Sequence, residues 1–140
     1  VFLACCETLA NHESELALES FAKFWTCLRL ILPDTRIIAR TDAFKEVLNH
    51  FGLDAIKAKR LDITGGAFCY RLERGGSKLS VHSWGCAIDM DPGNNPFPSK
   101  WKPKSGMIDP DFAAILQAHG FTWRGNAGDN DPMHFQLCTR

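Results

Sequence analysis

Two short stretches, far apart in the sequence, constrain most strongly how this chain can fold. The first, residues 80–89, reads Ser-Val-His-Ser-Trp-Gly-Cys-Ala-Ile-Asp, and the second, residues 131–136, reads Asp-Pro-Met-His-Phe-Gln. They supply the imidazoles of His82 and His134 and the carboxylate of Asp89. Two imidazoles and one carboxylate, with a fourth position open to water, make a catalytic rather than a structural zinc site. If these groups act together, the two stretches must become neighbours in the fold.

The spacing between His82 and Asp89 requires a bend in the chain. Seven residues along a flat strand would place these two side chains on opposite faces. A helix would align them, but Gly85 lies inside the stretch and Pro92 follows soon after it, which argues against a helix. We therefore expect a bend near Trp84 and Gly85, because glycine permits the backbone conformation that a sharp bend needs.

Composition and patterning predict a single α+β domain over residues 1–140, with helices packed on a small, mainly antiparallel sheet that carries the zinc site. Residues 1–60 are expected to be mostly helical, and residues 61–140 to be rich in strands and to hold the metal site. No apolar run reaches the roughly 20 residues that a membrane-spanning helix needs. Sixteen basic residues balance 16 acidic ones, so no electrostatic footprint for nucleic acid is present.

Local signals predict where the helices begin and end. Apolar residues at helical spacing predict helices over residues 7–32 and 42–51, the first ended by Pro33 and the second by Gly52. A third helix is predicted to begin with Asp109 as its N-cap, because a proline follows at the first helical position.

Short apolar runs predict the last two strands at residues 121–123 and 133–137. The four prolines within residues 91–108 predict an ordered surface loop that borders the site. We expect the six cysteines to be free thiols, because no Cys-x-x-Cys pair is present and the chain is large enough to fold without disulfides. They are Cys5, Cys6, Cys27, Cys69, Cys86 and Cys138.

The residues near the zinc site indicate hydrolytic chemistry. Bound zinc would lower the pKa of a water molecule towards about 7 and polarise a carbonyl. Asp131, three residues before His134, is placed to accept the proton of this water and later to protonate a leaving amine; neighbouring Asp129 is the alternative base. A cation is also needed to stabilise the developing oxyanion. Arg71 and Arg74 are the candidates, and Arg71 is favoured because it follows an apolar run that can anchor it.

The two stretches resemble the zinc D,D-carboxypeptidase and L-alanyl-D-glutamate endopeptidase family (VanY-like peptidases), and they are most similar to its bacteriophage endolysin branch. That family has the pattern Ser-x-His-x-x-Gly-x-Ala-x-Asp, followed by an acidic residue two or three positions before the histidine of a His-Trp or His-Phe pair. The resemblance covers roughly residues 61–137. It implies that His82, Asp89 and His134 bind one zinc ion per chain.

The same resemblance implies roles for residues around the metal. Asp131 would be the general base and Arg71 the arginine that steadies the scissile carbonyl, although the Arg74-Gly-Gly segment is also similar to the phage members. Two departures bear on rate and specificity. Asp131 stands where glutamate is commoner, and Gln136 stands where an acidic residue often follows the His-Phe pair.

The resemblance implies a metallopeptidase that hydrolyses peptide bonds in the peptidoglycan stem peptide, as a phage-type endolysin. Ser80 and Trp84 are expected to contact substrate, with Ser80 alternatively supporting the ligands by a hydrogen bond. Trp101 and Trp123 are further candidates to line the cleft. We expect a monomer, made in the cytoplasm without a recognisable signal peptide and acting on the cell wall or periplasm after release.

Two alternatives stay open at this point. One is a carboxypeptidase or dipeptidase that trims D-Ala from the same polymer. The other is a non-catalytic, zinc-stabilised binding module, because the family's fold also resembles the signalling domain of hedgehog proteins. An acidic base at Asp131 favours the enzyme.

Overall fold

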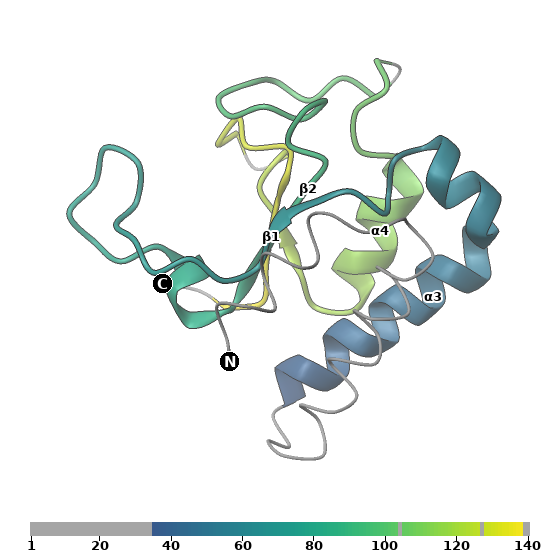
Figure 1. The fold of residues 1–140 in the computed structure, drawn as a ribbon, viewed down its shortest axis with the longest axis horizontal. Coiled ribbons are helices and arrows are strands. Elements are labelled where there is room, and N and C mark those ends of the chain that lie inside the picture. Colours follow the sequence, from purple (N-terminus) through teal and green to yellow (C-terminus); the bar gives the residue numbers. More distant parts are fainter. Residues whose placement is uncertain (1–34, 104, 127, 139–140) are drawn as a thin grey trace.

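The computed structural model describes residues 35–103, 105–126 and 128–138, and it has the α+β architecture that was predicted (Figure 1). The helix expected over residues 7–32 lies outside these described residues. In chain order the elements are α3 (Thr35–Ala58), β1 (Thr64–Gly66), the 3-10 helix η1 (Val81–Trp84), β2 (Ala87–Met90), α4 (Pro110–Ala118), β3 (Thr122–Trp123) and β4 (His134–Gln136).

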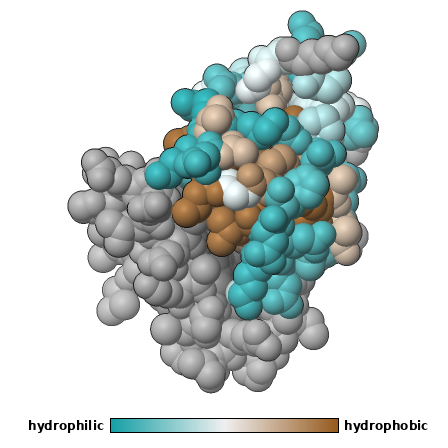
Figure 2. All heavy atoms as spheres, turned by 90° about the vertical axis from the view of Figure 1, so that its right-hand side faces the viewer, coloured by the Kyte–Doolittle hydropathy of each residue, from teal (hydrophilic) through white to brown (hydrophobic). Residues whose placement is uncertain are grey.

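Helix α3 runs past the glycine that was expected to end it. Gly52 has φ 71° and ψ 162°, which interrupts the helix, but the chain turns helical again and continues to Ala58. The prediction that the helix ends at Gly52 was therefore wrong, although the backbone does depart from helical geometry at that residue. Figure 2 shows the side of the molecule where α3 lies, with hydrophobic side chains gathered between hydrophilic ones. Among the described residues, no helix is long and apolar enough to cross a membrane.

Helix α4 begins as its sequence predicts. The side chain of Asp109 accepts a hydrogen bond from Asp111 N at 2.9 Å, with Pro110 in the first turn. The helix ends at Ala118. Lys59 Nζ lies 2.8 Å from the same aspartate, which joins the chain just after α3 to the start of α4.

A four-stranded antiparallel sheet has the order β1-β2-β4-β3. The strands predicted at residues 121–123 and 133–137 are confirmed, with somewhat shorter bounds. Ile88 pairs with Phe135, which in turn pairs with Trp123, so these three side chains lie in one row on one face. All three are buried.

The core forms between this face and the helices. Phe112 of α4 meets Phe135 edge-on, with ring centroids 5.7 Å apart, and Trp123 stacks on Phe135 with centroids 5.8 Å apart. Helix α4 contacts both α3 and β3, and Figure 1 shows it between the sheet and α3. The opposite face of the sheet is thus left for the functional site.

The described residues of the proline-rich segment 91–108 form an ordered loop, as predicted. Asn95 is only 1% exposed, and its amide nitrogen donates to Asp91 O at 3.0 Å while its amide oxygen accepts from Ile108 N at 2.8 Å. Arg60 makes two hydrogen bonds to the buried carboxylate of Asp91, at 2.9 and 2.8 Å. These contacts join the two ends of the loop and attach its start to the chain just after α3.

Three of the six cysteines belong to the described residues, and of these Cys69 is a free thiol, as expected. Cys86 is buried, Cys138 is partly buried and Cys69 is exposed. Cys5, Cys6 and Cys27 lie outside the described residues.

Candidate metal and catalytic site

His82 reaches the site from the short helix η1. Ser80 caps this helix by accepting a hydrogen bond from His82 N at 3.3 Å. Gly85 ends it with φ 62°, a left-handed conformation that residues other than glycine rarely adopt. The bend predicted near Trp84 and Gly85 is therefore present, although His82 lies on a 3-10 helix and not on a strand.

Asp89 and His134 reach the site from neighbouring strands. Asp89 of β2 pairs directly with His134 of β4, so both side chains project from the same face of the sheet. Ile88 and Phe135, one position away on each strand, project into the core. The alternation of strand side chains therefore separates the polar site from the apolar core.

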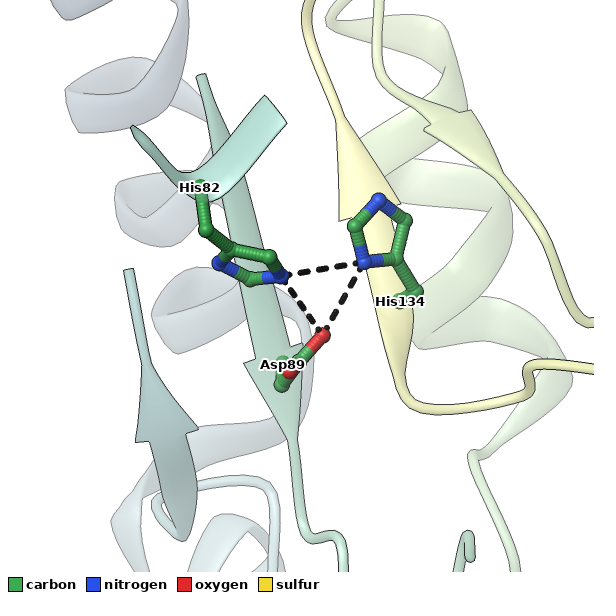
Figure 3. A group of neighbouring side chains, drawn as sticks. All are labelled: His82, Asp89 and His134. Atoms are coloured by element: carbon green, nitrogen blue, oxygen red, sulfur yellow. Dashed lines mark hydrogen bonds and ion pairs between the residues drawn. The ribbon is translucent and has the colours of Figure 1, made fainter. Parts of the chain in front are cut away.

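Three ligand atoms from these residues form a nearly equilateral triangle (Figure 3). His82 Nε2 lies 3.2 Å from His134 Nδ1 and 3.2 Å from Asp89 Oδ1, and His134 Nδ1 lies 3.1 Å from Asp89 Oδ1. Bonds of about 2.0–2.1 Å at tetrahedral angles separate zinc ligands by roughly 3.3 Å. The triangle therefore fits one face of a tetrahedral metal site, and the three residues could hold a metal ion. Their role as ligands stays a prediction.

The orientation of the His134 ring is fixed by Gln136. The Gln136 amide nitrogen donates to Cys138 O at 2.8 Å, so its amide oxygen points the other way, where it lies 3.1 Å from His134 Nε2. For Nδ1 to offer its lone pair to a metal ion, the proton of His134 must lie on Nε2, where it is donated to this amide oxygen. Gln136 accordingly takes the supporting position in which an acidic residue is common.

Hydrogen bonds control the charge of Asp89. Burial alone would raise the pKa of this carboxyl, but hydrogen bonds from His134 and His82, together with their charges, outweigh burial and hold the pKa well below its usual range. A carboxylate that stays ionised is ready to bind a cation.

Asp131 is positioned as a proton acceptor beside the triangle. Its Oδ1 is buried and has no hydrogen-bond partner among the described residues. Burial raises the pKa of Asp131, and the negative charge of Asp89 adds to the rise, whereas the charges of His134, His82 and Arg74 oppose it. A carboxylate with a raised pKa is a stronger base and retains a captured proton more readily, which suits a group that moves a proton in both directions.

A pocket of about 280 Å³ contains the triangle and Asp131. Arg71 and Arg74, the two predicted oxyanion-stabilising candidates, both line it. So do Phe97, from the proline-rich loop, and Arg124. The loop predicted to border the site therefore does so.

Asp129, the alternative base, is engaged elsewhere. Its carboxylate lies 2.8 Å from Arg124 Nε in an ion pair at the pocket wall. This leaves Asp131 as the better placed base. Sequence reasoning missed Arg124, although its position directly after a predicted strand was a usable signal.

The residues expected to contact substrate are less well placed than the ligands. Ser80 is buried and supports His82 through its backbone, and it is not among the residues that line the pocket. Trp84 is 67% exposed but also does not line it. Trp123 is buried in the core, and Trp101 packs against it edge-on at 4.9 Å. The expectation that Trp101 and Trp123 line the cleft was therefore wrong, because both rings fill the apolar interior.

Residues 74–137 match the family model described as D-alanyl-D-alanine carboxypeptidase. The match includes Arg74, Asp131 and all three residues of the triangle, whereas Arg71 precedes it. No curated protein and no solved structure matches the chain. The match supports the resemblance to the D,D-carboxypeptidase family, and with it a peptidase of this general type.

Proposed function

We propose that the chain is a zinc-dependent peptidase that hydrolyses peptide bonds in the stem peptide of peptidoglycan. The observation that carries this proposal is the triangle of His82, Asp89 and His134 with ligand atoms 3.1–3.2 Å apart, in one pocket with Asp131, whose Oδ1 is buried. The family match supports peptidase action independently, because it rests on sequence and not on geometry.

The proposed chemistry divides between the ion and the protein. A zinc ion held at the triangle would polarise the scissile carbonyl and lower the pKa of a water molecule. Asp131 accepts the proton of the attacking water and then donates it to the departing amine. Its raised pKa supports both steps, because the proton is held long enough to be passed on.

An arginine stabilises the negative charge that develops on the carbonyl oxygen. Arg71 donates through Nη1 to Leu72 O at 3.1 Å, whereas Arg74 lies over the ring of Phe97 at 6.0 Å and its charge acts on Asp131. Replacing each arginine by glutamine separates the two. Replacing the arginine that stabilises the oxyanion should lower kcat, and replacing the other should change kcat little.

The bond that is cut distinguishes two candidates. We propose endopeptidase action of the phage endolysin type, between L-Ala and D-Glu, by a single catalytic domain that spans residues 1–140 and acts on the cell wall after release from the cell. The second candidate is a D-Ala-D-Ala carboxypeptidase, which the description of the matched family favours.

Mass spectrometry of digested muropeptides tests the proposal. Zinc-loaded protein, the same protein with chelator, and zinc-loaded Asp131→Ala are incubated with purified peptidoglycan. Products bearing a new N-terminal D-Glu indicate the endopeptidase, and free D-Ala indicates the carboxypeptidase. If zinc-loaded protein releases neither product but still binds the polymer, the site is a binding module and the proposal is wrong.

A further inference from the structure

Arg124 continues the row of the sheet that holds two of the triangle residues. Trp123 pairs with Phe135, and Arg124 N donates to His134 O at 3.0 Å, so Arg124 lies level with His134. Asp89 lies level with His134 on its other side. Residues directly opposite one another on neighbouring strands project from the same face. Arg124 therefore projects from the site face, and it lines the pocket.

The guanidinium of Arg124 is held in place from one side. Its Nε lies 2.8 Å from Asp129 Oδ2, and the side chains are 31% and 38% exposed, respectively. The ion-pair contact is made through Nε. The edge formed by two Nη groups matches the two oxygens of a carboxylate, which is why arginine binds such groups in a bidentate manner.

The charges of the pocket favour an anionic ligand once a metal is bound. Three guanidinium groups, those of Arg71, Arg74 and Arg124, face four carboxylates in its lining. One of these carboxylates belongs to the triangle, and another is the partner of Arg124. A divalent cation adds two positive charges, so the formal balance of the loaded pocket becomes positive.

The distance from the triangle sets which part of a peptide Arg124 can reach. Neighbouring strands lie about 4.8 Å apart, so the Arg124 backbone is roughly one strand spacing from that of His134. Successive Cα atoms of a peptide are about 3.8 Å apart. A peptide whose scissile carbonyl lies at the triangle would therefore place groups within one or two residues of the cut near the guanidinium.

We propose that Arg124, oriented by Asp129, binds a carboxylate of the substrate adjacent to the scissile bond and so determines specificity for anionic peptides. This inference rests on the peptidase function proposed above. Two carboxylates of a stem peptide have the required chemistry: the C-terminal carboxylate and the α-carboxylate of D-Glu.

Three synthetic peptides test the inference. They are Ala-γ-D-Glu-Lys-D-Ala-D-Ala with free acids, the same peptide with a C-terminal amide, and the same peptide with the D-Glu α-carboxylate amidated. Values of kcat/KM are measured for zinc-loaded wild type, Arg124→Gln and Lys100→Gln, where Lys100 is an exposed cation outside the pocket lining. Zinc content is measured for each protein. Calorimetry with zinc-loaded Asp131→Ala, with and without Arg124→Gln, reports peptide binding without relying on turnover.

Wild type and Lys100→Gln should lose roughly 10- to 100-fold in kcat/KM or affinity when the recognised carboxylate is amidated, as expected for a lost charge-assisted hydrogen bond. The amide that causes the loss identifies the source. Arg124→Gln should show this loss already on the free acid, with unchanged zinc content, and no further loss on the amide. If Arg124→Gln falls below wild type by the same factor on the acid and on the amide, the role of Arg124 is purely structural and the inference is overturned. Wild type that binds and cleaves all three peptides alike would also overturn it. If no peptide is cleaved, the proposed function fails, and the calorimetric comparison of acid with amide decides the inference alone.

Discussion

Replacing Gln136 by leucine should weaken metal binding without removing any ligand of the triangle. Gln136 is 5% exposed, and its amide oxygen lies 3.1 Å from His134 Nε2. Its amide nitrogen is held by Cys138 O at 2.8 Å, so the acceptor cannot rotate away without losing a hydrogen bond. Leucine has a similar size but no acceptor. The substitution therefore removes the group that keeps the proton of His134 on Nε2.

The expected loss of zinc affinity has a similar magnitude whichever nitrogen of His134 then carries the proton. If the proton stays on Nε2, a buried donor is left without a partner, which costs about 1–3 kcal/mol. If the proton moves to Nδ1, the nitrogen that faces the triangle loses its lone pair. Loss of such a supporting partner typically lowers metal affinity about 10- to 100-fold, equivalent to about 1.4–2.8 kcal/mol.

Zinc affinity is measured by competition with a chromophoric chelator at fixed pH. Gln136→Glu retains an acceptor for His134, so its zinc affinity should stay within a few-fold of wild type. Gln136→Leu should bind zinc about 10- to 100-fold more weakly. Gln117→Leu, at an exposed position of α4, is the matched control and should not change the affinity. Zinc binding by folded Gln136→Leu within twofold of wild type would refute this account of the ring's orientation.

Asp131→Ala should retain zinc and lose hydrolysis of peptidoglycan by at least about 100-fold, measured by release of soluble muropeptides; wild-type rates in this variant would exclude Asp131 from the chemistry. Asp109→Ala should lower the free energy of unfolding by about 1 kcal/mol through loss of the helix cap. Asp109→Asn keeps the cap and loses only the ion pair with Lys59, so it should cost less. Burial alone would raise the pKa of Asp109, but the hydrogen bond and charge of Lys59, together with the backbone N–H of Asp111, outweigh burial and lower it. The ion pair therefore stabilises the fold above the unfolded-state pKa of about 3.9, and the difference between wild type and Asp109→Asn should vanish as pH falls through the lowered pKa; a constant difference in urea unfolding would contradict it. Gly125→Ala should destabilise by about 1–3 kcal/mol or more, because the new Cβ would lie 2.5 Å from an indole carbon, whereas Gly93→Ala meets nothing closer than 3.7 Å and should be nearly neutral in the same assay.

Local sequence signals predicted the parts of this fold that depend on neighbouring residues. Asp109 and the proline after it predicted the start of α4, because capping involves only a few consecutive residues. Gly85 predicted the bend that His82 and Asp89 need, because the seven-residue spacing excludes a straight strand. That His82, Asp89 and His134 converge was likewise predicted from the residue types and the resemblance.

Features that depend on strand pairing were not predictable in the same way. Arg124 enters the pocket only because Trp123 pairs with Phe135, and this register follows from contacts between distant segments. The same register turns Trp123 into the core, whereas the sequence analysis had predicted that Trp123 lines the cleft. Gly52 shows a related limit, since the helix continues beyond it and buries Ile56 in the core, although local propensity would end the helix there.

Native mass spectrometry of zinc stoichiometry tests whether His82, Asp89 and His134 share a metal ion. We expect one zinc ion bound by wild type and by Asp131→Ala, and none retained by Asp89→Asn, which preserves shape but removes the carboxylate charge from the triangle. Wild type that binds no zinc, or Asp89→Asn that retains a full equivalent under the same conditions, would contradict the claim that these three side chains share a metal ion.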